Sequence, residues 1–255
     1  MTLSFADLSV DLGGRRVLDN VGGCFAAGRV TIILGPNGAG KSTLLGYLAG
    51  LTKPTTGSVK LDGEPLGALA PRARARAIGL LPQRAEVAWD MVATALVALG
   101  RLPHTSTPAA DASAVAHALE ATDCLQFAQR RVLTLSGGEL ARVLLARVLA
   151  GQPRWLLADE PLASLDPAHQ LDVVARLRDV AARGVGVVVV VHDLTLAARF
   201  ADDVLMLREG RVVAAGPVAT TLEVATIAEV YGVEVEMSET ASGARTIVPI
   251  GRSAR

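Results

Sequence analysis

Eight residues, Gly35–Ser42, constrain the fold of this chain more than any other feature, because they match the pattern G-x-x-x-x-G-K-[ST]. The β-rich run Thr31–Leu34 precedes them, and a helical stretch from about Lys41 to Ala49 follows. Backbone N–H groups can converge on phosphate oxygens only where side chains do not obstruct them, and the three glycines of this loop remove that obstruction. Strand, glycine-rich turn and helix together predict a nucleotide phosphate site inside an α/β fold.

The positions of this loop have distinct chemical tasks. Lys41 would reach the β- and γ-phosphates of ATP, Ser42 would offer a hydroxyl to Mg²⁺, and the positive end of the helix would attract the anion. A glycine-rich turn followed by Lys-Ser by chance is the alternative, and the flanking strand and helix argue against it. The predicted ATP-binding residues are Gly35, Pro36, Asn37, Gly38, Ala39, Gly40, Lys41, Ser42 and Thr43.

Two further apolar runs end in polar residues that suit phosphoryl transfer. Trp155–Ala158 leads into Asp159 and Glu160, and Gly186–Val191 leads into His192. In open α/β sheets, ligands bind beyond the carboxyl ends of the strands. Asp159 could hold Mg²⁺, Glu160 could polarise the attacking water, and His192 could contact the γ-phosphate. Asp159 and Glu160 could instead simply cap the next helix, and His192 could be a surface histidine. The occurrence of all three residues after apolar strands, in one chain with a phosphate loop, favours catalysis.

The remaining segments predict further strands and one inserted helical region. Val59–Leu61 reads as a strand of an early β-region, whereas residues 87–135 are Ala-rich and helical. The continuous β-branched run before His192 is typical of a parallel sheet covered on both faces. Val204–Leu207 and Arg211–Ala214 predict a late hairpin, and the end of the chain has no predicted structure.

Charge and composition argue against several classes of protein. The 25 basic and 25 acidic side chains cancel, so no field of one sign would draw the chain to nucleic acid. Cys24 and Cys124 lack metal-ligand spacing, which predicts a reduced, cytoplasmic compartment. The apolar run Val187–Val191 has five residues, whereas a membrane span needs about 20, and the N-terminus lacks the pattern of a signal peptide. We expect contact with a membrane only through another chain.

Leu135–Glu139, with the sequence Leu-Ser-Gly-Gly-Glu, closely resembles the signature motif of ATP-binding cassette (ABC) proteins in its Glu-ending variant. The same residues form a capping box before an apolar run, and both interpretations can hold together. Gln83 is similar to the family's glutamine that touches Mg²⁺ and the attacking water. Ser164–Asp166 resembles its loop across the dimer interface, and His192 resembles its switch histidine.

The resemblance implies an α/β fold with a P-loop NTPase (RecA-like) core. This core would contain a mostly parallel sheet, an N-terminal antiparallel β-region and an inserted α-helical subdomain. Residues 1–255 would form a single ABC ATPase domain. Its parts would be a nucleotide-binding core in 1–86 and 136–215, a helical subdomain in 87–135 and a C-terminal tail in 216–255.

The resemblance also implies a head-to-tail homodimer that sandwiches two ATP molecules. Each phosphate loop would face the signature of the other subunit. The residues in contact with ATP across the dimer would be Ser136, Gly137, Gly138 and Glu139, and the interface loop would be Ser164, Leu165 and Asp166. The catalytic residues would be Glu160, His192 and Gln83, and Mg²⁺ would be held by Ser42, Gln83 and Asp159.

Three shorter segments, Gly100–His104, Ala168–Leu171 and Tyr231–Val235, resemble importer ATPases for ferric siderophores, haem and cobalamin. This narrower resemblance implies two permease subunits, which would dock near Trp89–Gly100, and indirectly a periplasmic or surface substrate-binding protein. It implies a peripheral position at the cytoplasmic face of the inner membrane, and no nucleic acid partner. In one departure from the family, Leu12 stands where an aromatic residue usually stacks on adenine.

Three alternatives remain at this stage. One is a soluble cassette ATPase that acts on DNA, ribosomes or cofactor assembly, although the chain lacks the second cassette, coiled-coil arms or basic extensions common in such proteins. The second is a cassette ATPase for another cargo. The third is a non-cassette P-loop enzyme such as a small-molecule kinase, which would have no use for Ser136–Glu139.

Overall fold

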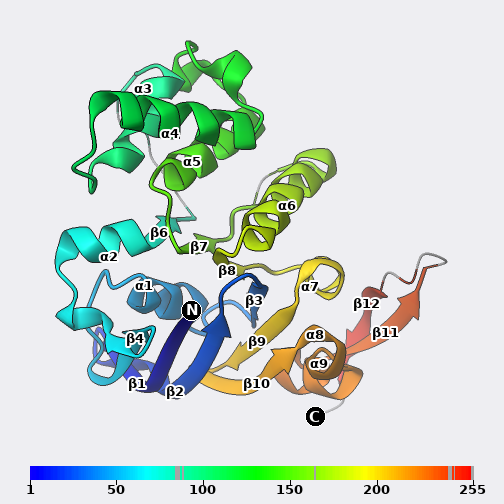
Figure 1. Ribbon diagram of the computed structural model, residues 1–255. Helices are drawn as coiled ribbons and strands as arrows, with labels where there is room; N and C mark the ends of the chain where they lie inside the picture. The colour runs from blue at the N-terminus through cyan, green and yellow to red at the C-terminus, as the bar shows by residue number, and fades with distance from the viewer. Residues whose placement is uncertain (84–86, 88, 164, 241–242, 244, 254–255) are drawn as a thin grey trace.

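The computed structural model covers residues 1–255 and describes all of them except 84–86, 88, 164, 241–242, 244 and 254–255. Figure 1 shows a core of β-strands and helices, a group of helices around α3, α4 and α5 at the top, and the hairpin β11–β12 projecting at one side. Within the described residues, no helix combines the length and apolar character needed to cross a bilayer.

The central sheet has six strands in the order β10-β9-β3-β8-β7-β6. Neighbouring strands are parallel except β9 and β10, which form the antiparallel hairpin that the sequence predicted. The strands are β3 (Val30–Leu34), β6 (Ile78–Leu81), β7 (Trp155–Asp159), β8 (Gly186–Val190), β9 (Asp203–Arg208) and β10 (Arg211–Pro217). This arrangement brings the carboxyl ends of β3, β6, β7 and β8 to one edge.

Both faces of the central sheet are buried, which explains why its strands are apolar throughout. Side chains alternate between the two faces along a strand. In β8, Val187 and Val189 join the core that includes helical residues such as Val173, whereas Val188 and Val190 join the core beneath the N-terminal strands. The predicted parallel sheet with two covered faces is confirmed.

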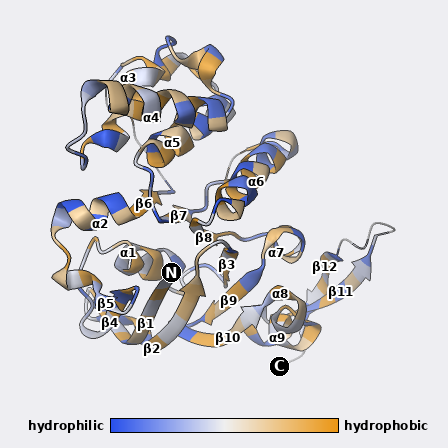
Figure 2. Ribbon diagram, in the orientation of Figure 1, coloured by the Kyte–Doolittle hydropathy of each residue, from blue (hydrophilic) through white to orange (hydrophobic). Residues whose placement is uncertain are grey.

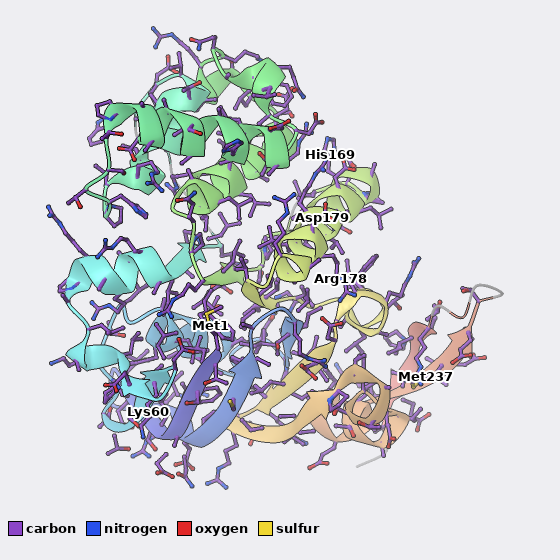
Figure 3. All side chains as sticks on the ribbon, viewed as in Figure 1. Met1, Lys60, His169, Arg178, Asp179 and Met237 are labelled. Atoms are coloured by element: carbon purple, nitrogen blue, oxygen red, sulfur yellow. The ribbon has the colours of Figure 1, made fainter. Side chains whose placement is uncertain are left out.

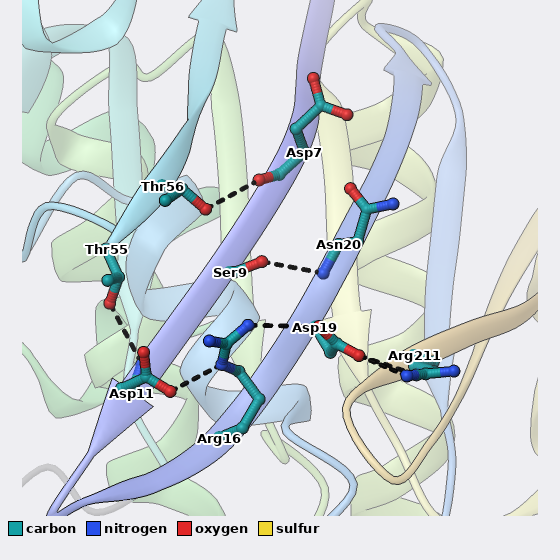
Figure 4. Close-up of polar contacts among 9 residues, drawn as sticks. All are labelled: Asp7, Ser9, Asp11, Arg16, Asp19, Asn20, Thr55, Thr56 and Arg211. Carbon is teal, nitrogen blue, oxygen red and sulfur yellow. Dashed lines mark hydrogen bonds and ion pairs between the residues drawn. The ribbon is translucent and has the colours of Figure 1, made fainter.

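The N-terminal β-region is a separate antiparallel sheet in the order β2-β1-β4-β5. Its strands are β1 (Thr2–Leu12), β2 (Arg15–Ala26), β4 (Thr56–Leu61) and β5 (Glu64–Pro65). Figure 4 shows the ion pairs that Asp19 of β2 forms with Arg16 in the same strand and with Arg211 in β10. Its two carboxylate oxygens lie 3.2 Å from Arg16 Nη1 and 2.6 Å from Arg211 Nη2. These contacts hold β2 beside the β9–β10 turn.

The helices cover the central sheet and form the inserted helical region. They are α1 (Lys41–Leu48), α2 (Pro71–Ala77), α3 (Ala93–Ala98), α4 (Pro108–Ala121), α5 (Gly137–Ala150), α6 (Pro167–Ala182), α7 (Leu194–Phe200), α8 (Val218–Thr221) and α9 (Val224–Tyr231). Short 3₁₀ turns occupy Leu66–Ala68, Leu99–Arg101, Leu125–Phe127 and Val132–Thr134. In Figure 2, hydrophilic and hydrophobic residues alternate in bands along α6, as expected for a helix with one buried face.

Helices α3, α4 and α5 pack against one another. Buried Arg101 helps to join them, since its Nε donates to Asp111 Oδ1 (2.7 Å) and its Nη1 donates to Ala150 O (2.9 Å). Thr107 caps α4 by accepting a hydrogen bond from Ala110 N, and Pro108 occupies the first helical position. Although α5 begins directly after the predicted boundary at residue 135, it packs with the inserted helices.

The end of the chain forms more structure than the sequence predicted. Two short helices, α8 and α9, are followed by a hairpin of β11 (Val233–Glu239) and β12 (Arg245–Arg252). The helix α9 contacts β9 and β10, and β12 contacts α7. The last part of the chain is therefore attached to the core at two places.

Candidate nucleotide-binding and hydrolysis site

The phosphate loop connects β3 to α1, and its shape requires glycine at two positions. Gly35 has φ 149° and Gly40 has φ 98°, a region that other residues rarely adopt. A Cβ atom at Gly35 would lie 2.2 Å from Leu207 O, and one at Gly40 would lie 2.6 Å from Leu18 Cδ2. These two glycines therefore let the loop pass close to β9 and β2.

The loop leaves an anion site at the start of α1. Gly40 precedes this helix and supplies no side-chain cap, so the first backbone N–H groups are available to a ligand. Lys41 is buried, and its Nζ donates to Gly35 O (2.7 Å) and Pro36 O (2.9 Å). Burial lowers the pKa of Lys41, although the carboxylates of Glu160 and Asp159 oppose that effect. The ammonium can exchange the two carbonyl oxygens for phosphate oxygens.

Ser42 and Asp159 meet at the end of β7. Ser42 Oγ donates to Asp159 Oδ1 at 3.0 Å. Burial raises the pKa of Asp159, and the hydrogen bond from Ser42 acts against this shift. A hydroxyl and a carboxylate are hard oxygen donors, which fit Mg²⁺. Mg²⁺ prefers six oxygen ligands, so phosphate oxygens of ATP and water molecules would supply the ligands beyond these two side chains.

Glu160 lies between Gln83 and His192, which follow β6 and β8, the two neighbours of β7 in the sheet. Its Oε2 accepts a hydrogen bond from Gln83 Nε2 at 2.6 Å, and its Oε1 lies 2.5 Å from His192 Nε2. Glu160 has φ 48°, a strained backbone conformation for a residue with a side chain, and such strain is common at functional sites. The carboxylate is held by two partners, and its charge acts on the pKa of Lys41 in the phosphate loop.

The predicted signature forms the N-terminus of α5. Ser136 Oγ accepts a hydrogen bond from Glu139 N (3.3 Å), and Glu139 Oε2 accepts one from Ser136 N (2.8 Å), so the capping box is present. The bond from Ser136 N lowers the pKa of Glu139. Ser136 and Gly137 are exposed. A Cβ atom at Gly138 would lie 2.7 Å from His169 Cδ2, at the start of α6 (Figure 3).

The predicted interface loop leads into α6. Asp166 is exposed and caps this helix, because its Oδ1 accepts a hydrogen bond from His169 N at 3.0 Å. Its Oδ2 lies 2.6 Å from His169 Nδ1. Leu165 is half-buried against the core, and Ser164 lies outside the described residues. Leu12 is half-exposed at the end of β1.

The structure thus brings Ser42 to Asp159 and brings Gln83 and His192 to Glu160. Among the described residues, no hydrogen bond or ion pair joins Ser136–Glu139 to the phosphate loop of the same chain. One contact to this loop is not predicted by the sequence: Tyr231 Oη accepts a hydrogen bond from Gly35 N at 2.8 Å. Local pattern carries no signal for this contact because 196 residues separate the two partners.

A parallel sheet with a phosphate loop at the end of β3 and acidic residues at the end of β7 defines a P-loop nucleoside triphosphatase. A family model described as ABC transporter matches residues 18–163. The chain belongs to the ABC transporter family, and it is an ATPase of that family. The predicted family, fold class and ATP hydrolysis are confirmed.

Relatives match the chain over nearly its whole length. A hemin import ATP-binding protein of Bordetella avium is 44% identical over 246 residues, which cover 93% of this chain and 94% of the relative. A cobalamin import ATP-binding protein of Halobacterium salinarum is 41% identical and covers 98% of this chain, which spans 64% of that relative.

Solved structures show the same fold. A transporter described as of the metal-chelate type, in an inward-facing conformation, superposes with a TM-score of 0.85 at 24% identity over 98% of this chain and 97% of that chain. A dimeric bacterial ABC transporter cassette has a TM-score of 0.76 at 28% identity, covering 85% of this chain and 98% of that cassette.

Proposed function

We propose that this chain is the ATP-hydrolysing subunit of an importer for haem, a ferric siderophore or cobalamin. The observation that carries the proposal is the similarity to hemin import ATP-binding proteins, at 44% identity in Bordetella avium and 43% in Rhodococcus jostii, over at least 93% of this chain. Two copies would work below two permease subunits at the cytoplasmic face of the membrane, and a periplasmic or surface binding protein would deliver the cargo.

The described residues can divide the chemistry of hydrolysis among themselves. Lys41 and the N-terminus of α1 would bind the phosphates of ATP, and Ser42, Asp159 and Gln83 would hold Mg²⁺. When bound, Mg²⁺ would neutralise negative charge on the phosphates. Glu160 orients the attacking water and accepts its proton, since the two hydrogen-bonded neighbours of Glu160 fix its carboxylate. Its neighbour His192 contacts the γ-phosphate.

A second copy of the chain would complete the site. Ser136 is exposed and its oxygen already accepts from Glu139 N, which leaves the hydroxyl proton free to donate to a phosphate. Gly137 is also exposed, so a triphosphate can approach the N-terminus of α5 closely. Because no bond joins this helix end to its own phosphate loop within the described residues, we place it against the loop of the partner.

The test of the paired site is Ser136→Arg. The added guanidinium would fill the space in front of α5, so we expect ATPase activity and ATP-dependent dimerisation to be lost while the monomer still binds a non-hydrolysable ATP analogue. Ser113→Arg, at an exposed position of α4, is the matched control and should retain ATPase activity and ATP-dependent dimerisation. Full ATPase activity in the Ser136 variant would instead indicate a P-loop enzyme that works within one chain.

The transport partner and the cargo need a separate experiment. Trp89 and Leu102 are 75% and 73% exposed near the segment predicted to meet the permease, and docking would remove this apolar surface from water. We expect the chain to co-purify with permease subunits and to drive ATP-dependent uptake of one of the three cargoes into proteoliposomes that contain them. Co-purification with nucleic acid in place of a permease would overturn the transport assignment.

A further inference from the structure

The backbone of Gly35, the first residue of the phosphate loop, is held from both sides. Its N–H donates to Tyr231 Oη at 2.8 Å, and its carbonyl oxygen accepts from Lys41 Nζ at 2.7 Å. At φ 149°, Gly35 adopts a backbone conformation that glycine alone enters readily, so these two hydrogen bonds define the loop where it leaves β3.

ATP binding would draw on only one of these two bonds. The Lys41 ammonium has three N–H donors, and two of them now go to the carbonyl oxygens of Gly35 and Pro36, so it has to redirect at least one of these in order to reach both the β- and the γ-phosphate. The bond from Gly35 N to Tyr231 Oη involves neither Lys41 nor the phosphates. Burial raises the pKa of Tyr231 to about 12, so the phenol stays neutral at physiological pH and remains a stable partner for the N–H group.

Tyr231 belongs to a C-terminal unit, residues 224–252, that is anchored independently on the core. Thr195 Oγ1 donates to Ile247 O and accepts from Ile247 N, both at 3.0 Å. Thr195 lies in α7, three residues after His192. The unit therefore contacts the phosphate loop through Tyr231 and contacts α7, which begins two residues after His192, through Ile247.

Packing of the aromatic ring alone does not explain why residue 231 is a tyrosine rather than a phenylalanine. Tyr231 contributes to the wall of a cavity of about 870 Å³ that is also lined by the loop residues Pro36–Ala39 and by Arg15 and Arg252. A phenylalanine could fill the same ring position, but it would leave Gly35 N–H without its partner at the edge of this cavity. The hydroxyl therefore contributes a hydrogen bond to the phosphate loop, and the packing of the hydrophobic core does not require it.

We propose that Tyr231 is a positioning residue for the ATPase reaction, which keeps the start of the phosphate loop in its binding conformation while Lys41 redirects its hydrogen bonds to the nucleotide. The inference rests on the proposed role of the loop in ATP binding. It assigns the C-terminal unit a role in ATP binding rather than a purely structural one.

Tyr231→Phe tests this proposal, because it removes the hydroxyl alone. Loss of one neutral hydrogen bond corresponds to roughly a fivefold change in an equilibrium constant. We expect the Kd for a non-hydrolysable ATP analogue, and the KM for ATP, to rise about fivefold, with kcat changed less than about twofold. Hydrogen exchange of a peptide spanning residues 30–40 should also become faster, as measured by mass spectrometry.

Tyr47→Phe is the matched control, since Tyr47 is the only other tyrosine and its hydroxyl makes no hydrogen bond within the described residues. Both variants are compared with the natural chain below their unfolding temperatures. A lower unfolding temperature of Tyr231→Phe with unchanged Kd and KM would show a merely structural residue and overturn the inference.

A second variant keeps the test decisive if Tyr231→Phe folds poorly. Thr195→Val removes both hydrogen bonds to Ile247 and should weaken ATP binding in the same direction, whereas unchanged binding would contradict the role of the unit. Failure of the proposed function is recognised separately, because the natural chain would then lack ATPase activity and transport whatever residue occupies position 231.

Discussion

Replacing Glu160 by glutamine should abolish ATP hydrolysis and preserve ATP binding. The two side chains have the same shape, so the amide oxygen of the Glu160→Gln variant can still accept the hydrogen bond that Gln83 Nε2 now donates over 2.6 Å to the carboxylate. The amide also remains within hydrogen-bonding distance of His192. The substitution therefore removes the charge and the basicity while it leaves the arrangement of the site in place.

The size of the effect follows from the role of the carboxylate. A positioned general base contributes about 10²- to 10⁴-fold to a rate. We expect kcat to fall about 10³-fold, which is about 4 kcal/mol in the activation barrier. Because His192 is 44% exposed, losing its contact with the charge should alter the free energy of unfolding by less than about 1 kcal/mol.

The assay is steady-state phosphate release together with equilibrium binding of ATP and gel filtration with ATP. Glu209→Gln is the matched control, since Glu209 also has a positive φ, 50° against 48° for Glu160, and its side chain is 83% exposed in the β9–β10 turn. It should hydrolyse ATP normally, while Glu160→Gln should accumulate as an ATP-bound dimer. Retained turnover in Glu160→Gln would remove Glu160 from the role of general base.

Two further predictions concern the loop and its acidic neighbour. Gly35→Ala places a Cβ atom 2.2 Å from Leu207 O, so it should destabilise the chain by about 2–5 kcal/mol in denaturant unfolding and abolish ATP binding. Gly63→Ala is the control. Gly63 has φ 88° and open space around it, so this substitution should lower the free energy of unfolding by only about 1 kcal/mol. Burial raises the pKa of Asp159 in the folded chain, so its protonated form is favoured there and stability is lost as pH rises through that pKa. Asp159→Asn should therefore make the nucleotide-free chain more stable than the natural chain at neutral pH and flatten this pH dependence, while Mg²⁺-dependent hydrolysis is lost. Lower stability of Asp159→Asn at neutral pH would contradict the direction of the shift.

Much of the site could be predicted because its chemistry is carried by short contiguous segments. The loop at Gly35–Ser42 and the residues that follow β7 and β8 need only a strand before them to be interpreted. The capping box at Ser136 and Glu139 is likewise local, since both of its hydrogen bonds span three residues. Patterns of this length are visible in a single sequence because the backbone geometry they require is decided within a few residues.

The sequence by itself determined the family, the parallel sheet and the identity of the groups that can bind and hydrolyse ATP. Only the tertiary structure decided which of these groups meet. Strand order places His192 beside Glu160 and brings Ser42 to Asp159, whereas Ser136 lies exposed at the start of α5. The tertiary structure also revealed the contact between Tyr231 and Gly35 and the hairpin β11–β12 that follows Tyr231 in the chain. Such contacts depend on how distant segments pack, and no periodicity or local motif encodes the separation between them.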